Sequence, residues 1–522
     1  MYSRRIPRWL VAGLLCLMVL AAATSAWITR HGPGFEGNSV PYVSAARTFA
    51  QTGVMLVPDD KGQMGRLVLW PPLYPATMGA LSKVFGDALP AGRWLNVGLF
   101  PLNILLLALL GWQLGLAKRP LALVCLLFTF APVTLYAHIN LMSESLCLFW
   151  WLGTLNGLLV YHRRQTWPIL VSVALLAALT WLSRFIAIAT IASGALFVLG
   201  CTQGTWHRRV WRGGAFGLMA VAPLEIWTHF LSGVTIIGTR KLSYYGLAKH
   251  QIDQILRAWL RWVVPFDQMA AVKVAAIAVF VVWLGFLVLK IYRHRDSIFA
   301  AGADGGAISQ AGLILIALNF AAVEGVIFCT ALFLDVTLDM GERMHYFAFV
   351  FVLLLLGAMG SALVRGALAT SGPPARKFAA AVPILILAGY FAGGALWLSQ
   401  ADSVHLNYNA RAWRESPALA ALAQKYSDTL IYTNHIGAIY LHTGRTDARL
   451  VPLSLDKTRP MAMADFEDSF ANMLRETTAH HGLIVYFRET YDRAPLESVE
   501  KDPRLKVLET FPDAVFFVPA GK

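Results

Sequence analysis

The chain alternates between long apolar stretches and short basic segments, and this pattern constrains its fold more than any other feature. About 20 apolar residues cross a bilayer as a helix, and eleven stretches approach or reach that length. Only 14% of the 522 residues are charged, whereas soluble domains carry roughly 25%. A soluble globular protein and a disordered chain are therefore excluded. The candidate spans are 9–28, 95–116, 120–137, 143–161, 167–183, 186–201, 213–232, 271–291, 310–334, 345–364 and 378–398.

The basic residues indicate how these spans are oriented. With the N-terminus in the cytoplasm, alternate loops hold sixteen lysines and arginines against two acids, Asp296 and Asp304. This is the positive-inside pattern of membrane proteins, and it accounts for the net charge of +14 without nucleic acid as a partner. The pattern requires a turn at Arg184 between two short spans, since charge in hydrocarbon is unfavourable. We predict a multi-pass protein of the cell inner membrane with a cytoplasmic N-terminus.

The irregular segments then lie on the outer side of the membrane. The first outer loop covers 29–92 and contains a predicted helix over 39–52, which Gly53 ends. In the tail, strand patterns at 429–432, 483–487, 505–510 and 514–518 alternate with helical patterns at 418–426 and 464–480. We therefore expect an all-α polytopic membrane domain over residues 1–399, followed by a small extracytoplasmic α/β domain over residues 400–522.

Charged residues gather at the predicted outer edge of the membrane, where an ionisable group indicates a functional site. A carboxylate at such a place can take a proton from an attacking hydroxyl. Arginines can bind a phosphate leaving group through paired hydrogen bonds. The pattern favours group transfer with a phosphate-bearing lipid at the outer face. The charged residues considered are Glu36, Arg93, Glu144, Arg184, Arg240 and Arg343.

Five segments resemble, in the same order, membrane glycosyltransferases of the GT-C fold. They are most similar to the group of the protein O-mannosyltransferases and the aminoarabinose lipid A transferases. The resemblance covers roughly the first half of the chain and the overall topology. The segments are NSVPYVSAAR at 38–47, WPPLYP at 70–75, AGRWLN at 91–96, MSESL at 142–146 and LSRF at 182–185.

The resemblance implies a hexosyl- or pentosyltransferase that takes its sugar from a polyprenyl-phosphate donor in the lipid bilayer. The acceptor would be a lipid, glycan or protein of the cell envelope, and the anomeric configuration would invert. Some relatives use a divalent cation; this chain shows no ligand cluster that requires one, and the question stays open. The implied donor-phosphate ligands are Arg93, Arg184, Arg240 and Arg343, and the implied supporting residues are Asn38, Tyr42 and Glu144.

One position departs from the family pattern. These enzymes carry an acid, the general base, three or four residues before the tyrosine of the first loop. Here Ser39 and Asn38 stand at that distance from Tyr42, and neither is a base at neutral pH. Glu36 is the nearest carboxylate, and glycines on both sides of it give the loop freedom to fold differently. We therefore expect Glu36 to serve as the base.

Each assignment has a structural alternative. Glu36 of the first loop can be a solvated side chain. Arg93, at the start of the second span, can be an interfacial anchor. Two functional alternatives also stay open: a transporter or flippase of lipid-linked sugars, and a catalytically inactive relative. The structural alternatives are a helix cap for Asn38 and Glu144, loop charge for Glu36 and Arg240, an anchor for Arg93, a lipid headgroup or Glu144 as the partner of Arg184, and a salt bridge of Arg343 with Glu342 or Asp339.

Overall fold

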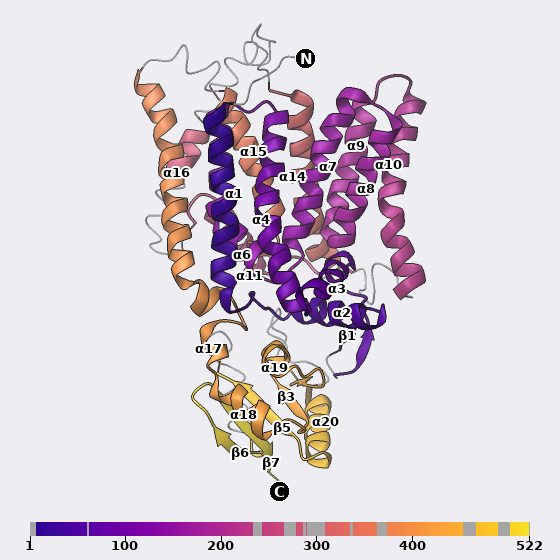
Figure 1. Ribbon diagram of the computed structural model, residues 1–522, viewed down its shortest axis with the longest axis vertical. Helices are drawn as coiled ribbons and strands as arrows, with labels where there is room; N and C mark the ends of the chain where they lie inside the picture. The colour runs from indigo at the N-terminus through magenta and orange to yellow at the C-terminus, as the bar shows by residue number, and fades with distance from the viewer. Residues whose placement is uncertain are drawn as a thin grey trace.

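The protein is a bundle of helices with a small sheet at one end, as the computed structural model shows (Figure 1). It describes residues 7–59, 62–232, 243–265, 278–285, 289, 308–334, 338–362, 373–452, 466–488 and 502–520. The long helices run side by side, and α1 begins at the end opposite the sheet (Figure 1). They are α1 (Arg8–Ile28), α4 (Ala88–Gln113), α5 (Lys118–Phe130), α7 (Glu144–Arg164), α8 (Trp167–Ser183), α9 (Ile188–Cys201), α10 (Trp206–Ile226), α14 (Gln310–Phe333), α15 (Tyr346–Ala362) and α16 (Pro373–Gln400).

Every predicted span except 271–291, which falls largely outside the described residues, coincides with a helix or a pair of helices. The predicted turn at Arg184 is found, because α8 ends just before it and the short turn η2 (Phe185–Ala187) leads into α9. The stretch 120–137 bends by 56° between α5 and α6 (Pro132–Ile139). Within the described residues, four helices are long and apolar enough to cross a membrane, or five with this pair. The total of eleven spans stays a prediction.

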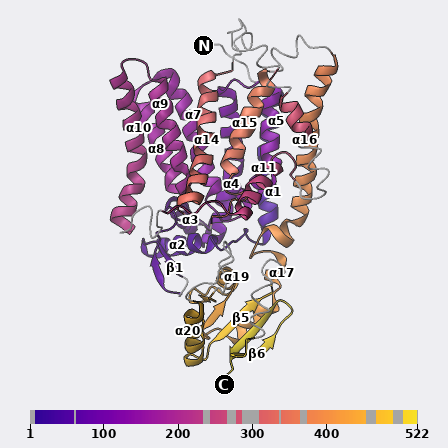
Figure 2. The same cartoon turned by 180° about the vertical axis from the view of Figure 1, so that it is seen from behind.

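The first outer loop folds onto the end of the bundle that faces the sheet (Figures 1 and 2). The predicted helix is confirmed as α2 (Ser39–Thr52), and it ends at Gly53 with φ of 76°. Asn38 takes the N-cap position without a side-chain cap hydrogen bond, so its predicted capping role is wrong. The Ser39 hydroxyl instead accepts a hydrogen bond from the Glu36 N–H at 3.0 Å. The strands β1 (Leu56–Pro58) and β2 (Met64–Arg66) and the helix α3 (Leu73–Phe85) complete the loop.

The tail forms a five-stranded mixed sheet in the order β4-β3-β5-β7-β6. β3 pairs in parallel with β4 and β5, whereas β7 pairs antiparallel with β5 and β6. The four predicted strands and both predicted helices are found, whereas β4, α17 and α19 were not predicted. The elements are α17 (Arg411–Arg414), α18 (Pro417–Lys425), β3 (Ile431–Thr433), α19 (Ile436–Thr443), β4 (Arg449–Leu450), α20 (Phe466–Ala479), β5 (Leu483–Phe487), β6 (Leu505–Thr510) and β7 (Ala514–Pro519).

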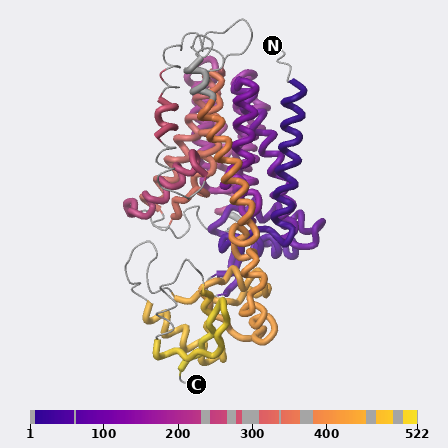
Figure 3. Tube along the Cα trace, turned by 90° about the vertical axis from the view of Figure 1, so that its left-hand side faces the viewer, coloured from indigo at the N-terminus to yellow at the C-terminus, as the bar shows by residue number. Residues whose placement is uncertain are grey.

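A two-residue extended segment of the first loop joins the bundle to the tail. The Gly34 carbonyl accepts a hydrogen bond from the Leu141 N–H at 2.9 Å, which ties the segment to the bundle. On the other side, the Phe35 N–H donates to the Leu406 carbonyl at 3.1 Å and the Phe35 carbonyl accepts from the Tyr408 N–H at 2.9 Å. These hydrogen bonds fix Glu36, the next residue of the chain, at the place where the bundle, the first loop and the tail meet. Figure 3 shows the tail beyond that end of the bundle.

Gly34→Ala tests whether this junction needs a residue without a side chain. A Cβ on Gly34 would collide with the Asn140 side chain, whereas a Cβ on Gly37 has open space around it. Overpacking of this kind costs roughly 1–3 kcal/mol. We expect Gly34→Ala to lower the unfolding temperature of the purified protein and Gly37→Ala to leave it near the wild-type value. Equal unfolding temperatures for all three proteins would contradict the packing described here.

Candidate active site

A single buried carboxylate holds two arginines at the end of the bundle that faces the sheet. Glu144 is the first residue of α7, and its side chain is 1% exposed. Its Oε1 atom lies 2.8 Å from Arg184 Nη1 and 2.8 Å from Arg343 Nε. An acid in the first turn of a helix also interacts favourably with the helix dipole. Glu144 therefore fixes two guanidinium groups that come from distant parts of the sequence.

Glu36 extends this cluster toward the tail. Its Oε2 atom lies 2.7 Å from Arg343 Nη1, and its side chain is 16% exposed. Arg343 thus bridges two carboxylates. With Arg184, the cluster holds two carboxylates and two guanidinium groups. Because hydrogen-bonded opposite charges offset one another in a poorly hydrated site, the group tolerates burial at the membrane edge. The structure brings together three of the sequence-predicted charges with the predicted base.

The surroundings of Glu36 suit a proton acceptor. Burial raises the pKa of Glu36 above its ordinary value, and the neighbouring Arg343 charge offsets only part of this effect. The negative charges of Glu144 and Asp339 raise it further. Burial works to lower the pKa of Arg343, but Glu144 and Glu36 raise it, and Arg343 stays charged. A carboxylate with a raised pKa binds a proton more readily than a free one.

Tyr42 of α2, for which the resemblance implies a supporting role, lies beside the cluster. Its buried hydroxyl lies 3.1 Å from the Ser143 hydroxyl, to which Arg184 Nη1 donates a hydrogen bond at 3.4 Å. The Tyr42 ring packs edge-on against Tyr74, with ring centroids 5.3 Å apart. Burial raises the pKa of Tyr42, so the phenol stays neutral. Tyr42 therefore helps to hold Arg184 in place through Ser143.

Three other predicted residues take different places. Arg93 donates to the Ala26 carbonyl at 2.9 Å and to the Thr29 hydroxyl at 3.1 Å, which ties α4 to the end of α1. The structure thus does not bring Arg93 to Arg184 and Arg343, and its contacts match the anchor alternative. Asn38 is exposed at the start of α2. Arg240 lies outside the described residues.

The salt bridges proposed as alternatives for Arg343 are wrong. Arg343 pairs with Glu36 and Glu144, while Glu342 pairs with Arg261 at 2.7 Å. Sequence reasoning missed Arg261, which ends α11 (Lys249–Arg261). The 4-and-3 spacing of apolar residues at 252, 256 and 259 is the signal that could have revealed this amphipathic helix.

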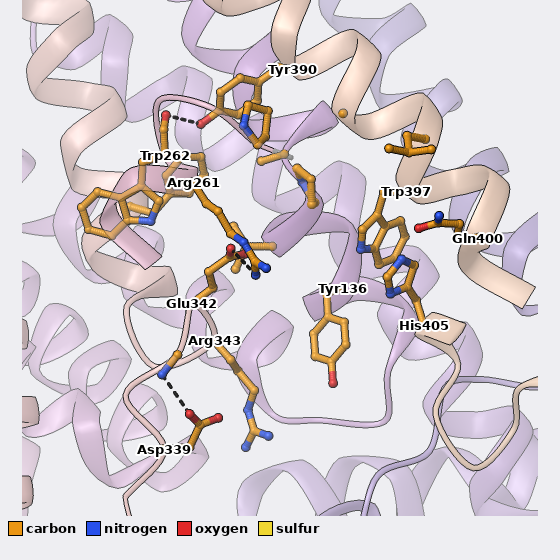
Figure 4. A pocket seen from close by; sticks show the side chains of 18 of the residues that line it. Tyr136, Arg261, Trp262, Asp339, Glu342, Arg343, Tyr390, Trp397, Gln400 and His405 are labelled. Carbon is orange, nitrogen blue, oxygen red and sulfur yellow. Dashed lines mark hydrogen bonds and ion pairs between the residues drawn. The ribbon is translucent and has the colours of Figure 1, made fainter. Parts of the chain in front are cut away.

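A cavity of about 690 Å³ adjoins the charged cluster on its bundle side. Arg343, Glu36 and Asp339 line one part of it. The opposite part is formed largely by aromatic and aliphatic side chains, and Figure 4 shows several of them around the arginines. Such a cavity offers a charged end and an apolar wall to the same ligand. The apolar wall includes Trp262, Phe349, Tyr390, Leu396 and Trp397.

A second cavity, of about 760 Å³, lies between the cluster and the tail. Trp413, Phe487 and Asp513 of the tail line it. Glu36 and His405 line both this outer cavity and the one on the bundle side. The carboxylate of Glu36 therefore stands at the boundary of two ligand-sized spaces.

The described part of the chain offers no group of three histidine, cysteine or acidic side chains arranged to hold a metal ion. Glu36 and Asp339 both line the cavity on the bundle side. Arg343 already contacts Glu36, and the Asp339 carboxylate accepts a hydrogen bond from the Gly341 N–H at 3.0 Å. Glu36 and Asp339 are therefore two described carboxylates of this cavity that could contact a cation.

Comparison with solved structures identifies the fold. ArnT from Cupriavidus metallidurans bound to undecaprenyl phosphate superposes with a TM-score of 0.56, 12% identity and 97% of each chain covered. The Archaeoglobus fulgidus oligosaccharyltransferase in complex with Zn and sulfate superposes with a TM-score of 0.54 and 12% identity. The superposition covers 90% of this chain and 68% of that chain. Mycobacterial arabinofuranosyltransferase AftD superposes with a TM-score of 0.51 and 15% identity. This chain is fully covered there but spans only 40% of AftD.

At these identities the likeness shows the fold alone: the chain has the GT-C fold of membrane glycosyltransferases. No protein-family model and no curated protein sequence matches the chain. The fold agrees with the sequence prediction of a helical, polytopic membrane protein.

Glu144→Gln tests the role of the shared carboxylate. The amide keeps the shape but removes the charge that holds Arg184 and Arg343. Removing one partner of a buried ion pair costs roughly 3 kcal/mol or more, so we expect a clear fall in the unfolding temperature. Asp87→Asn is the matched control, because the Arg47–Asp87 pair is 30% and 39% exposed and exposed pairs contribute about 1 kcal/mol or less. Similar losses in both variants would contradict a special role for Glu144.

Proposed function

We propose that this protein is a membrane glycosyltransferase that moves a sugar from a polyprenyl-phosphate donor to a hydroxyl group of a cell-envelope acceptor. The observation that carries the proposal is the position of Glu36. Its carboxylate lines two cavities and lies 2.7 Å from Arg343, the arginine at the charged end of the cavity on the bundle side. The GT-C fold supports this assignment, since membrane sugar transferases share it.

The cavity on the bundle side suits the donor. The apolar side chains of α16 form one wall, and α16 exposes Ile384 and Leu385 on the surface of the bundle, where lipid would contact it. A polyprenyl chain can enter beside this helix and leave its phosphate at Arg343. The two ion pairs of Arg343 use its Nε–H and an Nη1–H, and a guanidinium has five N–H donors in all. The solved ArnT structure with undecaprenyl phosphate supports this class of ligand.

The outer cavity suits the acceptor, because the tail lines it and Glu36 reaches it. Glu36 removes the proton from the acceptor hydroxyl as the oxygen attacks the anomeric carbon. The bond between that carbon and the phosphate oxygen breaks, and the polyprenyl phosphate leaves with the electron pair. Arg343 stabilises the charge that develops on the leaving phosphate. Attack from the face opposite the leaving group inverts the anomeric configuration.

The same proposal fixes the topology. Residues 1–399 form the membrane domain, and residues 400–522 form an extracytoplasmic domain beside the first outer loop. Contacts between the loop and the tail support a common side, since Arg47 Nη1 donates to the Tyr440 hydroxyl at 3.2 Å and Phe35 stacks on Tyr440. The positive-inside pattern supports an N-terminus in the cytoplasm, and we propose the cell inner membrane as the location of the protein.

The inactive-relative alternative predicts that Glu36 points away from the arginines, with no cavity between them. The Arg343–Glu36 pair and the adjoining cavity argue against it. The transporter alternative predicts polar residues near the middle of the membrane. The charged cluster lies instead at one end of the bundle, beside the first loop and the tail.

Glu36→Gln tests the base directly. General-base catalysis contributes roughly a hundredfold to ten-thousandfold in rate, so we expect a loss of at least a hundredfold in sugar transfer. The measurement is transfer of radiolabel from a polyprenyl-phosphate sugar by purified protein in lipid nanodiscs, with a cell-envelope extract as the acceptor. Undecaprenyl-phosphate binding should survive, because Arg343 remains. Full activity of the variant would remove Glu36 from the mechanism.

The pH dependence gives a second test. Glu36 accepts a proton only when ionised, and its pKa is raised. The rate should therefore rise with pH through a range above that of an ordinary carboxylate and then level off. The rise should vanish in Glu36→Gln, while Asp87→Asn should keep the wild-type profile. A wild-type rate that does not change with pH over this range would contradict the assignment.

A further inference from the structure

The helix α11 contacts the segment that carries Arg343 at three points. The Met340 N–H donates to Gln254 Oε1 at 3.0 Å, and Gln251 Nε2 donates to the Leu338 carbonyl at 3.2 Å. Arg261 pairs with Glu342 at 2.7 Å, and Figure 4 shows the two side chains turned toward each other. The three contacts fall on residues 338, 340 and 342, directly before Arg343.

This segment has little regular structure of its own. Residues 338–345 form bends and turns between α14 and α15, with the Met344 N–H donating to the Gly341 carbonyl at 3.1 Å. Glu144 and Glu36 hold the Arg343 guanidinium directly, and the backbone that carries Arg343 depends on what holds the residues before it. A misplacement of about 1 Å in a substrate-binding group can lower a rate a hundredfold. Within the described residues, α11 supplies three side-chain contacts to this segment from outside it.

A second side of α11 is apolar and exposed. Ile252, Leu256 and Trp259 are 44%, 51% and 39% exposed, and their spacing of four and three residues puts them on one stripe of the helix. The charged residues Asp253 and Arg257 lie next to this stripe. A helix with a lipid-facing stripe beside a charged edge is typical of the membrane surface.

The end of α11 connects the stripe to the bundle. The Tyr390 hydroxyl of α16 donates to the Trp262 carbonyl at 2.7 Å. The Trp262 ring lies 6.1 Å from the Phe349 ring of α15. The end of α11 therefore packs against α15 and α16, and α16 exposes Ile384 and Leu385 on the surface of the bundle. This attachment to apolar helices of the bundle favours bilayer lipid, rather than a second copy of the chain, as the occupant of the stripe.

We propose that α11 lies in the outer surface of the bilayer and positions Arg343, with Gln254 as the positioning residue. The lipid-facing stripe anchors the helix, and the inner side of the helix fixes residues 338–342 through hydrogen bonds. The inference rests on the proposed function only where it assigns a phosphate to Arg343. It predicts that the bilayer itself helps to build the donor site.

Gln254→Met and Gln254→Glu form a matched pair that tests the hydrogen bond. Methionine keeps the length of the side chain but loses the oxygen, whereas glutamate keeps an oxygen that accepts from the Met340 N–H. In nanodiscs of phosphatidylethanolamine and phosphatidylglycerol, we expect Gln254→Met to speed amide exchange over 338–345 and to weaken undecaprenyl-phosphate binding about fivefold to tenfold. Gln254→Glu should restore both values toward the wild type. Wild-type exchange and binding in Gln254→Met would overturn the proposal.

Leu256→Ser and Arg257→Ser test the lipid anchor. Both residues are exposed neighbours, so neither change should unfold the protein. We expect Leu256→Ser to speed exchange over 338–345 in the same nanodiscs, and Arg257→Ser to have no such effect. Equal behaviour of the two variants would overturn the lipid assignment. A smaller particle mass for Leu256→Ser than for the wild type would also overturn it, since the stripe would then bind a second copy.

Amide exchange separates this inference from the proposed function. If wild-type protein does not bind undecaprenyl phosphate, the assignment of Arg343 to the donor fails, while exchange over 338–345 still reports whether α11 holds the segment. If wild-type protein binds the lipid and Gln254→Met changes neither readout, the inference about α11 fails and the proposed function stands.

Discussion

One carboxylate oxygen organises the outer end of this molecule. Glu144 Oε1 receives Arg184 from the break between α8 and α9 and Arg343 from the segment before α15. Burying an isolated charge at this depth would be strongly unfavourable, and each arginine in turn needs an anionic partner. Glu36 from the first loop supplies the second anion. The cluster can therefore form only when four distant parts of the chain have folded against one another.

The position of Glu36 follows from backbone pairing of the two residues that precede it, Gly34 and Phe35. Gly34 and Phe35 hydrogen-bond to the bundle on one side and to the tail on the other. This pairing places the Glu36 side chain at the boundary between the two cavities. The chemistry proposed for Glu36 is thus a consequence of where the chain crosses from the membrane to the tail.

Local patterns predicted most of the fold. Apolar length located the helices, Gly53 marked the end of α2, and alternating residues located four strands of the tail. These features depend on residues that are near one another in the sequence, so they can be predicted from a single sequence without an alignment. The number of spans does not follow as directly, because helices such as α8, α9 and α15 are apolar but short.

The site was predicted in part. The sequence supplied Glu36, Glu144, Arg184 and Arg343 because charge near an apolar span is rare and needs a reason. The sequence offered Glu144 as one candidate partner of Arg184, and the structure shows that pair. The sequence did not supply the pairing of Arg343 with Glu144, because the two residues are separated by 199 positions. Charge type alone could not tell Arg93, which binds carbonyl and hydroxyl oxygens at the end of α1, from the arginines of the cluster.

The central claim is that a lipid phosphate and the base Glu36 meet at Arg343. An experimental structure of the protein in nanodiscs with undecaprenyl phosphate tests it most directly. The account predicts the phosphate within hydrogen-bonding distance of Arg343, with the first isoprene units along Tyr390 and Trp397 of α16. A phosphate bound elsewhere, with the cavity beside Glu36 empty of lipid, would contradict the account.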